Sequence, residues 1–214
     1  SKENYDIIKN FIDVCNNGSV EEAYNMLSMQ CKEEVYPTQD MFYDEYFSKI
    51  FDSKKSYDIT AWMESNNITY KINFMSDLLA TGKQDEETFE DYYTVVYENG
   101  EDKLNIRGFV EKEDINNKSA EESDVIFTVK SKVVYMDDES YEIEITNNND
   151  EVVKLDSKES TDSVYLKDEN GVRYNWMGHE IDDKQLVLEA GETKTLNIKF
   201  NKLYNPRRID TQIS

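Results

Sequence analysis

This chain has little proline, glycine, cysteine and histidine, and these shortages exclude several classes of protein. Its 214 residues include 2 Pro, 7 Gly, 2 Cys and 1 His. The scattered glycines form neither G-x-x-x-x-G-K-[ST] nor G-x-G-x-x-G, so no phosphate-binding loop is predicted. The single histidine, His179, leaves no H-E-x-x-H zinc site, and no G-x-S-x-G motif supports a serine nucleophile. We therefore expect a protein that is not an enzyme, with no catalytic residues, no metal and no cofactor.

Positive charge is also scarce, which limits the partners of the chain. Lys and Arg total 24 against 46 Asp and Glu, a formal net charge of −22. Such a charge repels phosphate backbones, so we expect no nucleic-acid partner. No run of about 18 apolar residues occurs, so no transmembrane segment is predicted. The 15 Tyr, 9 Phe and 2 Trp supply the apolar area that a folded core requires.

The two cysteines are too few for a disulfide framework. We expect Cys15 to end one helix and Cys31 to follow the next, antiparallel helix, which places them at opposite ends of a helical hairpin. A ten-residue helix is roughly 15 Å long, whereas a disulfide needs Cα atoms within about 7 Å. Two buried free thiols are predicted.

The beginning of the chain and its composition favour an extracytoplasmic protein. The sequence starts at Ser1-Lys2-Glu3 rather than at Met, which is typical of a mature chain whose signal, lipid or membrane anchor has been removed. A cytosolic protein with a tag remnant is the alternative. The bias toward Asn, Lys, Asp, Glu and Tyr is typical of a low-GC, Gram-positive-type bacterium.

The first third of the chain has helical periodicity. Tyr5, Ile8 and Ile12 share one face of a helix that Asn16-Asn17-Gly18 ends. Ser19 and Glu22 predict a capping box at the start of a second helix, whose buried face extends to Leu27. Pro37-Thr38 opens a third helix, in which Phe42, Tyr46 and Ile50 recur at helical spacing.

After Phe51 the period changes from 3.6 to 2, which predicts antiparallel strands. Strands are expected at 57–64 and 68–74, joined at Asn66-Asn67, and at 89–97 and 104–110, joined at Asn99-Gly100. The polar segment 78–87 is expected to be a loop. Three helices followed by four strands predict an α+β domain.

This order resembles the NTF2-like superfamily, in which a bent antiparallel sheet curls around helices into a cone. The segment Glu22-Ala23-Tyr24-Asn25-Met26-Leu27-Ser28 and residues 42–51 carry the resemblance. It implies an NTF2-like domain over 1–112. Such domains often pair through the open face of the sheet, which implies a homodimer unless an appended domain covers that face.

The polar, charged segment 113–123 is predicted to be a linker, and only strand patterns follow it over 124–214. Asp168-Glu169-Asn170-Gly171 is expected to be a hairpin turn, and Ala190-Gly191-Glu192 precedes an apolar strand. This part is similar to the immunoglobulin-like modules of bacterial envelope proteins and lipoproteins. The resemblance implies an all-β sandwich, without the paired cysteines of antibody domains.

Tyrosines and acidic loops are the remaining candidates for a site. Some NTF2-like proteins, ketosteroid isomerases among them, move protons within the cone by Asp and Tyr groups. Tyr70, Tyr93 and Tyr97 are therefore candidate ligand-binding residues, with core packing as the competing interpretation. The clusters 137–139, 149–151 and 182–183 gather oxygen atoms of the kind that calcium prefers, but none fits the calcium loop of an EF-hand, and solvated turns explain them better.

Two functions remain from the sequence. The first is a non-catalytic, extracytoplasmic binding or assembly module with protein partners at the cell envelope, as a secreted protein, a lipoprotein or a conjugation-associated component. The alternative is a small-molecule-binding or isomerase-type NTF2-like cone. The alternative requires an enclosed apolar pocket with a carboxylate of raised pKa.

Overall fold

The fold is described from a computed structural model that covers residues 2–77, 79, 82, 88–155 and 164–214. The chain divides into two compact units, a first unit of Ser1–Val110 and a second unit of Glu111–Ser214. Of the described residues, 47% lie in strands and 24% in helices. The protein is therefore mostly β, and helices of four residues or more with α geometry are confined to the first unit in the described chain.

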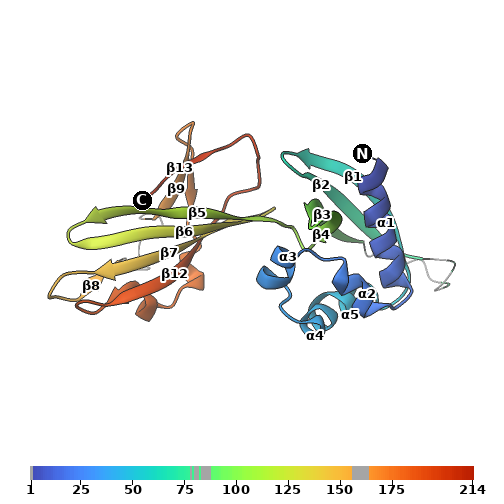
Figure 1. The fold of residues 1–214 in the computed structure, drawn as a ribbon, viewed down its shortest axis with the longest axis horizontal. Helices are drawn as coiled ribbons and strands as arrows, with labels where there is room; N and C mark the ends of the chain where they lie inside the picture. Colours follow the sequence, from blue (N-terminus) through green and yellow to red (C-terminus); the bar gives the residue numbers. More distant parts are fainter. Residues whose placement is uncertain (1, 78, 80–81, 83–87, 156–163) are drawn as a thin grey trace. The chain divides into compact units, whose positions relative to one another are not determined.

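The helical part of the first unit consists of one long helix followed by short segments (Figure 1). The elements are α1 (Lys2–Asn16), α2 (Val20–Asn25), α3 (Met29–Glu34), α4 (Gln39–Phe42), the π-helix η1 (Tyr43–Phe47) and α5 (Ser48–Ile50).

Local signals explain where these helices begin and end. As predicted, α1 ends at Asn16, and Gly18 adopts a φ of 77° that suits glycine. The predicted start at Thr38 is also confirmed, because its hydroxyl accepts a hydrogen bond from the Met41 amide at 3.2 Å. The predicted capping box is wrong, since Ser19 precedes α2 but makes no side-chain capping bond.

A four-stranded antiparallel sheet, in the order β1-β2-β3-β4, forms the rest of the first unit. Its strands are β1 (Lys55–Glu64), β2 (Ile68–Ser76), β3 (Phe89–Glu98) and β4 (Glu101–Asn105). α1 packs on one face of this sheet, where the rings of Phe11 and Tyr93 meet edge to face at 5.6 Å. The turns predicted at Asn66-Asn67 and Asn99-Gly100 are confirmed, and both residues of the second turn have positive φ. The predicted loop 78–87 lies largely outside the described residues.

The second unit contains strands and two short 3-10 helices. The first two residues of β5 (Phe109–Glu122) belong to the first unit and the rest to the second. The other elements of the second unit are β6 (Val125–Tyr135), β7 (Glu139–Asn147), β8 (Val153–Lys154), β9 (Tyr165–Asp168), β10 (Arg173–Asn175), η2 (Gly178–Glu180), η3 (Asp183–Leu186), β11 (Val187–Leu188), β12 (Thr193–Phe200) and β13 (Asp210–Ile213). β12-β7-β6-β5 form a four-stranded sheet, whose strands lie side by side in Figure 1, and β10-β9-β13 form a three-stranded sheet. β11 and β8 make a separate pair. The predicted hairpin turn at 168–171 is confirmed by the pairing of β9 with β10.

An isolated bridge between Trp176 and Phe200 joins the two larger sheets of the second unit. The Met177 amide donates to the Lys199 carbonyl at 2.7 Å, and the Asn201 amide donates to the Asn175 carbonyl at 2.9 Å. β10 is thereby attached to β12, and the strands follow one another as β5-β6-β7-β12-β10-β9-β13. In the described chain, β5 and β13 are the two outer strands of this series.

The predicted fold class is wrong. In the described residues the expected cone of three helices is not evident, because only α1 is long and the other helical segments have three to six residues. The segment predicted as the second helix breaks at Leu27, which bridges to Leu104 of β4, and Ser28 then starts a new helix by accepting from the Cys31 amide at 3.0 Å. Tertiary contact with β4 thus overrides helical periodicity. In place of a two-sheet sandwich, the second unit has sheets of four, three and two strands.

The predicted linker is also wrong over most of its length. Strand β5 continues to Glu122, and a turn of two residues with positive φ, Ser123 and Asp124, leads into its neighbour β6. Asn116 and Asn117 also have positive φ within β5, which marks an irregularity in that strand. The segment lacks apolar alternation because most of its side chains are exposed, and periodicity therefore could not identify it.

Two further predictions can be compared with the structure. Cys15 and Cys31 are buried free thiols, as expected. Among the described helices, none is long and apolar enough to span a bilayer.

Candidate functional site: an apolar cavity in the second unit

The three candidate tyrosines do not form one site. Tyr70 and Tyr93 are cross-strand partners on β2 and β3 and are buried under the helices. Tyr70 packs edge to face on Tyr5 of α1 at 5.0 Å, as the core-packing interpretation requires. Tyr97 is 75% exposed.

Tyr93 instead belongs to a buried polar network that the sequence analysis missed. The Tyr46 hydroxyl, from the π-helix, donates to the Asp91 carboxylate at 2.6 Å and lies 2.7 Å from the Tyr93 hydroxyl. The Arg107 amide donates to the same carboxylate at 3.0 Å from a turn in which Arg107 and Gly108 both have positive φ. Asp91, Tyr93 and Val95 occupy every second position of β3, and all three are buried. Because successive side chains of a strand point to opposite faces, this spacing alone could have placed Asp91 on the inner face.

Burial shifts the pKa values of this network. Burial raises the pKa of Asp91 to about 6, against the lowering effect of the hydrogen bonds from Tyr46, Tyr92, Arg107 and Gly108. Burial and the neighbouring Asp91 charge raise the pKa of Tyr46 well above its usual value. The cavity lined by residues of the second unit, described below, and a hollow lined by residues 19–22 and 25 include no residue of this network. Its hydrogen bonds connect η1, β3 and the turn before β5.

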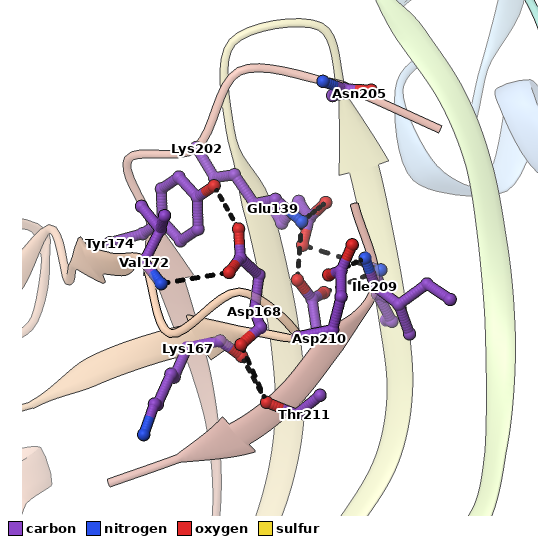
Figure 2. A network of polar contacts seen from close by, with 12 residues as sticks. Glu139, Lys167, Asp168, Val172, Tyr174, Lys202, Asn205, Ile209, Asp210 and Thr211 are labelled. Atoms are coloured by element: carbon purple, nitrogen blue, oxygen red, sulfur yellow. Dashed lines mark hydrogen bonds and ion pairs between the residues drawn. The ribbon is translucent and has the colours of Figure 1, made fainter. Parts of the chain in front are cut away.

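A second polar cluster lies in the second unit and joins β13 to the four-stranded sheet. We call Lys132, Glu139, Tyr141, Lys202 and Asp210 the Lys–carboxylate cluster. Figure 2 shows Lys202 reaching between Glu139 and Asp210, with Tyr174 and Asp168 beside them. Lys202 Nζ lies 2.5 Å from Asp210 and 3.3 Å from Glu139, and Lys132 Nζ lies 2.8 Å from Asp210. The Tyr141 hydroxyl also donates to Asp210.

The two carboxylates of this cluster have shifted pKa values in opposite directions. Burial and the hydrogen bond with Asp210 raise the pKa of Glu139 to about 7, although both lysines oppose this. Burial acts to raise the pKa of Asp210, but hydrogen bonds from Glu139, Lys132, Lys202 and Tyr141 hold it well below its usual value. Asp210 is therefore the ionised member of the pair, and the cluster is nearly neutral when Glu139 is also ionised.

Beside this cluster, the second unit contains an apolar cavity of about 690 Å³. Tyr141 and Asp210 belong both to the cluster and to the cavity lining. The two outer strands of the series, β5 and β13, both line the cavity, through residues 118–122 and 210–213. The rest of the lining is the apolar core of the unit and includes Phe127, Val129, Ile143, Ile145, Leu166, Trp176, Leu186, Leu196 and Ile198.

The composition of β5 distinguishes it from the rest of the lining. After Ile115, the strand supplies Asn, Lys, Ser, Ala and Glu side chains and no bulky apolar group. Ile115 is therefore the last large apolar side chain that β5 contributes to the lining, which continues with Phe127 on the neighbouring strand β6. The volume is in the range of small-molecule sites, which is about 300–1,000 Å³.

The acidic loops do not gather into a metal site. No group of three or more His, Cys, Asp or Glu side chains in the described residues is arranged to hold a metal ion. Glu139 is held by lysines, and Asp182 caps η3 by accepting from the Lys184 amide at 3.1 Å. These contacts account for two of the acidic groups that suggested calcium.

Comparison with family models, curated proteins and solved structures found no match to this chain.

Proposed function

We propose that the chain is a non-catalytic binding module whose ligand site is the apolar cavity of the second unit. The cavity is the observation that carries the proposal, because it combines an apolar lining with a few polar groups, as small-molecule sites do. The polar groups that converge on it, Tyr141 and Asp210, are fixed in place by Lys132 and Lys202.

The proposed setting is extracytoplasmic, at the cell envelope or as a secreted protein. The acidic composition and the bias toward Asn, Lys and Tyr support this setting. In that setting a ligand-loaded second unit would serve a sensing, carrier or assembly role, with the first unit available for protein contacts.

Trp176 makes the site testable by fluorescence. It is 7% exposed and lines the cavity, whereas the other tryptophan, Trp62, is 47% exposed on the first unit. In a Trp62→Phe variant, Trp176 is therefore the sole indole. The uncharged probe N-phenyl-1-naphthylamine should quench its emission saturably by energy transfer, at a stoichiometry of about one per chain.

Filling the cavity provides the matched comparison. Val129→Phe places a larger side chain in the lining and should weaken probe binding by about tenfold or more, without loss of stability. Asn197→Phe adds a phenyl ring on the exposed face of β12, opposite the lining residues Leu196 and Ile198, and should leave binding unchanged. A probe that does not saturate, or equal binding by the two variants, would exclude the cavity as the site. If Val129→Phe instead lost roughly 1–3 kcal/mol of stability, the space would be a closed core.

A further inference from the structure

Lys202 is the most deeply buried member of the Lys–carboxylate cluster. Its side chain is 1% exposed, and those of Glu139 and Asp210 are 3% and 8% exposed. Lys202 Nζ lies 2.5 Å from Asp210 Oδ1 and 3.3 Å from Glu139 Oε1, so one amine meets two carboxyl groups in a site largely shielded from solvent (Figure 2). A buried ion pair adds little net stability, because removing its charges from water costs about as much as their attraction returns. Ion pairing alone is therefore a weak reason for burying this lysine.

The two oxygens of the Asp210 carboxyl group have different surroundings. Oδ1 contacts Lys202, whereas Oδ2 lies 2.8 Å from Lys132 Nζ and accepts a hydrogen bond from the Tyr141 hydroxyl. Two donors on one oxygen stabilise the negative charge that develops on it when a nucleophile adds to the carboxyl carbon. Asp210 is thus positioned to be attacked at Cγ, with the Lys202 amine in contact at its other oxygen.

Glu139 is positioned to move protons between these two groups. Its Oε1 lies 3.3 Å from the Lys202 amine, and its carboxyl group forms a hydrogen bond with Asp210. Burial and that hydrogen bond raise the pKa of Glu139 to about 7, so near neutral pH it can both accept and release a proton. Glu139 therefore has the contacts and the proton affinity of a general acid–base.

From this geometry we propose that Lys202 and Asp210 form an intramolecular amide bond, an isopeptide cross-link, with Glu139 as the general acid–base. Lys202 passes a proton to Asp210 Oδ1, and the neutral amine then adds to Cγ, which forms the N–C bond. Glu139 accepts a proton from the nitrogen and donates one to Oδ1, and the C–Oδ1 bond breaks as water leaves. One ammonium and one carboxylate thus become one amide and one water, no electrons are gained or lost, and Glu139 ends as it began.

The surroundings favour this condensation over the ion pair. In water an amine and a carboxylic acid remain apart as ions, but burial penalises both charges, and contact at 2.5 Å replaces a bimolecular encounter. After the bond forms, Lys132 and Glu139 remain as one positive and one negative group 3.6 Å apart. Lys202 follows β12 and Asp210 begins β13, so the bond fastens an outer strand of the series to the four-stranded sheet. The reaction occurs once per chain and does not depend on the binding function proposed above.

Mass spectrometry of the full chain tests the bond. The intact protein should be lighter than its sequence by one water molecule. After denaturation, trypsin cuts an unbonded chain after Lys202 and Arg208 and releases 200–202 and 209–214 as separate peptides. The bonded chain should instead give a branched peptide in which 200–207 is joined to 209–214, because an acylated lysine is not cleaved.

Matched variants test the role of each group. Lys202→Arg keeps the positive charge but cannot form the amide, so the loss of water and the branched peptide should both disappear. Glu139→Gln keeps the size of the side chain but cannot exchange protons, and should lower the bonded fraction of freshly purified protein by about tenfold or more. Glu142→Gln, on the same strand but outside the cluster, should leave the bond complete. Trp176 emission in the Trp62→Phe background checks that each variant folds, and the peptide map of the parent decides the proposal where a variant does not.

The other outcomes overturn the proposal. A parent chain of full sequence mass, with 200–202 recovered as a separate peptide, would exclude the bond. A loss of water at Asp210 that leaves Lys202 open to trypsin would also exclude it, because that product is a succinimide. A branched peptide that contains Lys132 in place of Lys202, or Glu139 in place of Asp210, would contradict the assigned pair.

Discussion

At the scale of single residues, one carboxylate in the first unit determines a measurable pH dependence. Asp91 is buried and has a pKa of about 6, above its usual 3.8. A raised pKa means that the folded protein holds the Asp91 proton more tightly than the unfolded chain does. The corresponding stability is present at low pH and is lost as the pH rises through about 6.

Replacing this carboxylate should remove that dependence. In urea unfolding followed by helical ellipticity, which reports the first unit, the parent protein should lose about 1 kcal/mol more than Asp91→Asn between about pH 5 and pH 7.5. The variant should also be less stable at the lower pH, because an amide cannot accept both from Tyr46 and from the Tyr92 and Arg107 amides. Parallel pH profiles of the two proteins would contradict the assignment of a raised pKa to Asp91.

At the scale of elements, most of strand β5 was wrongly predicted from the sequence to be a linker. Its side chains after Ile115 resemble those of a linker, but its backbone pairs with β6 and one end of the strand is buried. Pairing between strands depends on backbone groups, which every non-proline residue supplies, so the pattern of side chains can miss a strand.

Glycine substitution distinguishes a strand from a linker. Replacing Lys118, Ser119 and Ala120 with glycine should lower the stability of the second unit by roughly 2 kcal/mol, because glycine in a strand costs about 0.5–1 kcal/mol per residue. Trp176 fluorescence during urea unfolding measures this in the Trp62→Phe background, and helical ellipticity serves as the internal control for the first unit. An unchanged Trp176 transition would mean that the segment contributes no more than a linker does.

At the scale of the whole molecule, repulsion between like charges dominates the electrostatics. The net charge of −22 destabilises any compact state, and the Lys–carboxylate cluster compensates it only locally. Salt screens exposed charges strongly and buried pairs weakly, and the side chain of Lys202 is only 1% exposed.

Salt should therefore stabilise this protein. Raising NaCl from about 50 mM to about 500 mM should increase Tm by several degrees, since about 1 kcal/mol corresponds to roughly 2–4 °C in a chain of this size. Differential scanning calorimetry at constant pH measures the shift. A decrease in Tm would show that attractive ion pairs outweigh the repulsion.

The sequence by itself determined features whose cause is local. The end of α1 at Asn16, the start of α4 after Thr38 and the Asn99-Gly100 turn follow from glycine conformation, hydroxyl capping and positive φ, which neighbouring residues control. Composition likewise determined the net charge.

Only the tertiary structure decided the fold class, the strand β5 and both polar clusters. Leu27 departs from the predicted helix because it forms a bridge with Leu104, which lies far along the chain. The Tyr46 hydroxyl reaches the Asp91 carboxylate because η1 packs on β3. The candidate cavity was beyond sequence reasoning for the same reason. Its lining brings residues of β5 and β13 together with core residues of β6, β7 and β12, and that juxtaposition depends on which strands become neighbours.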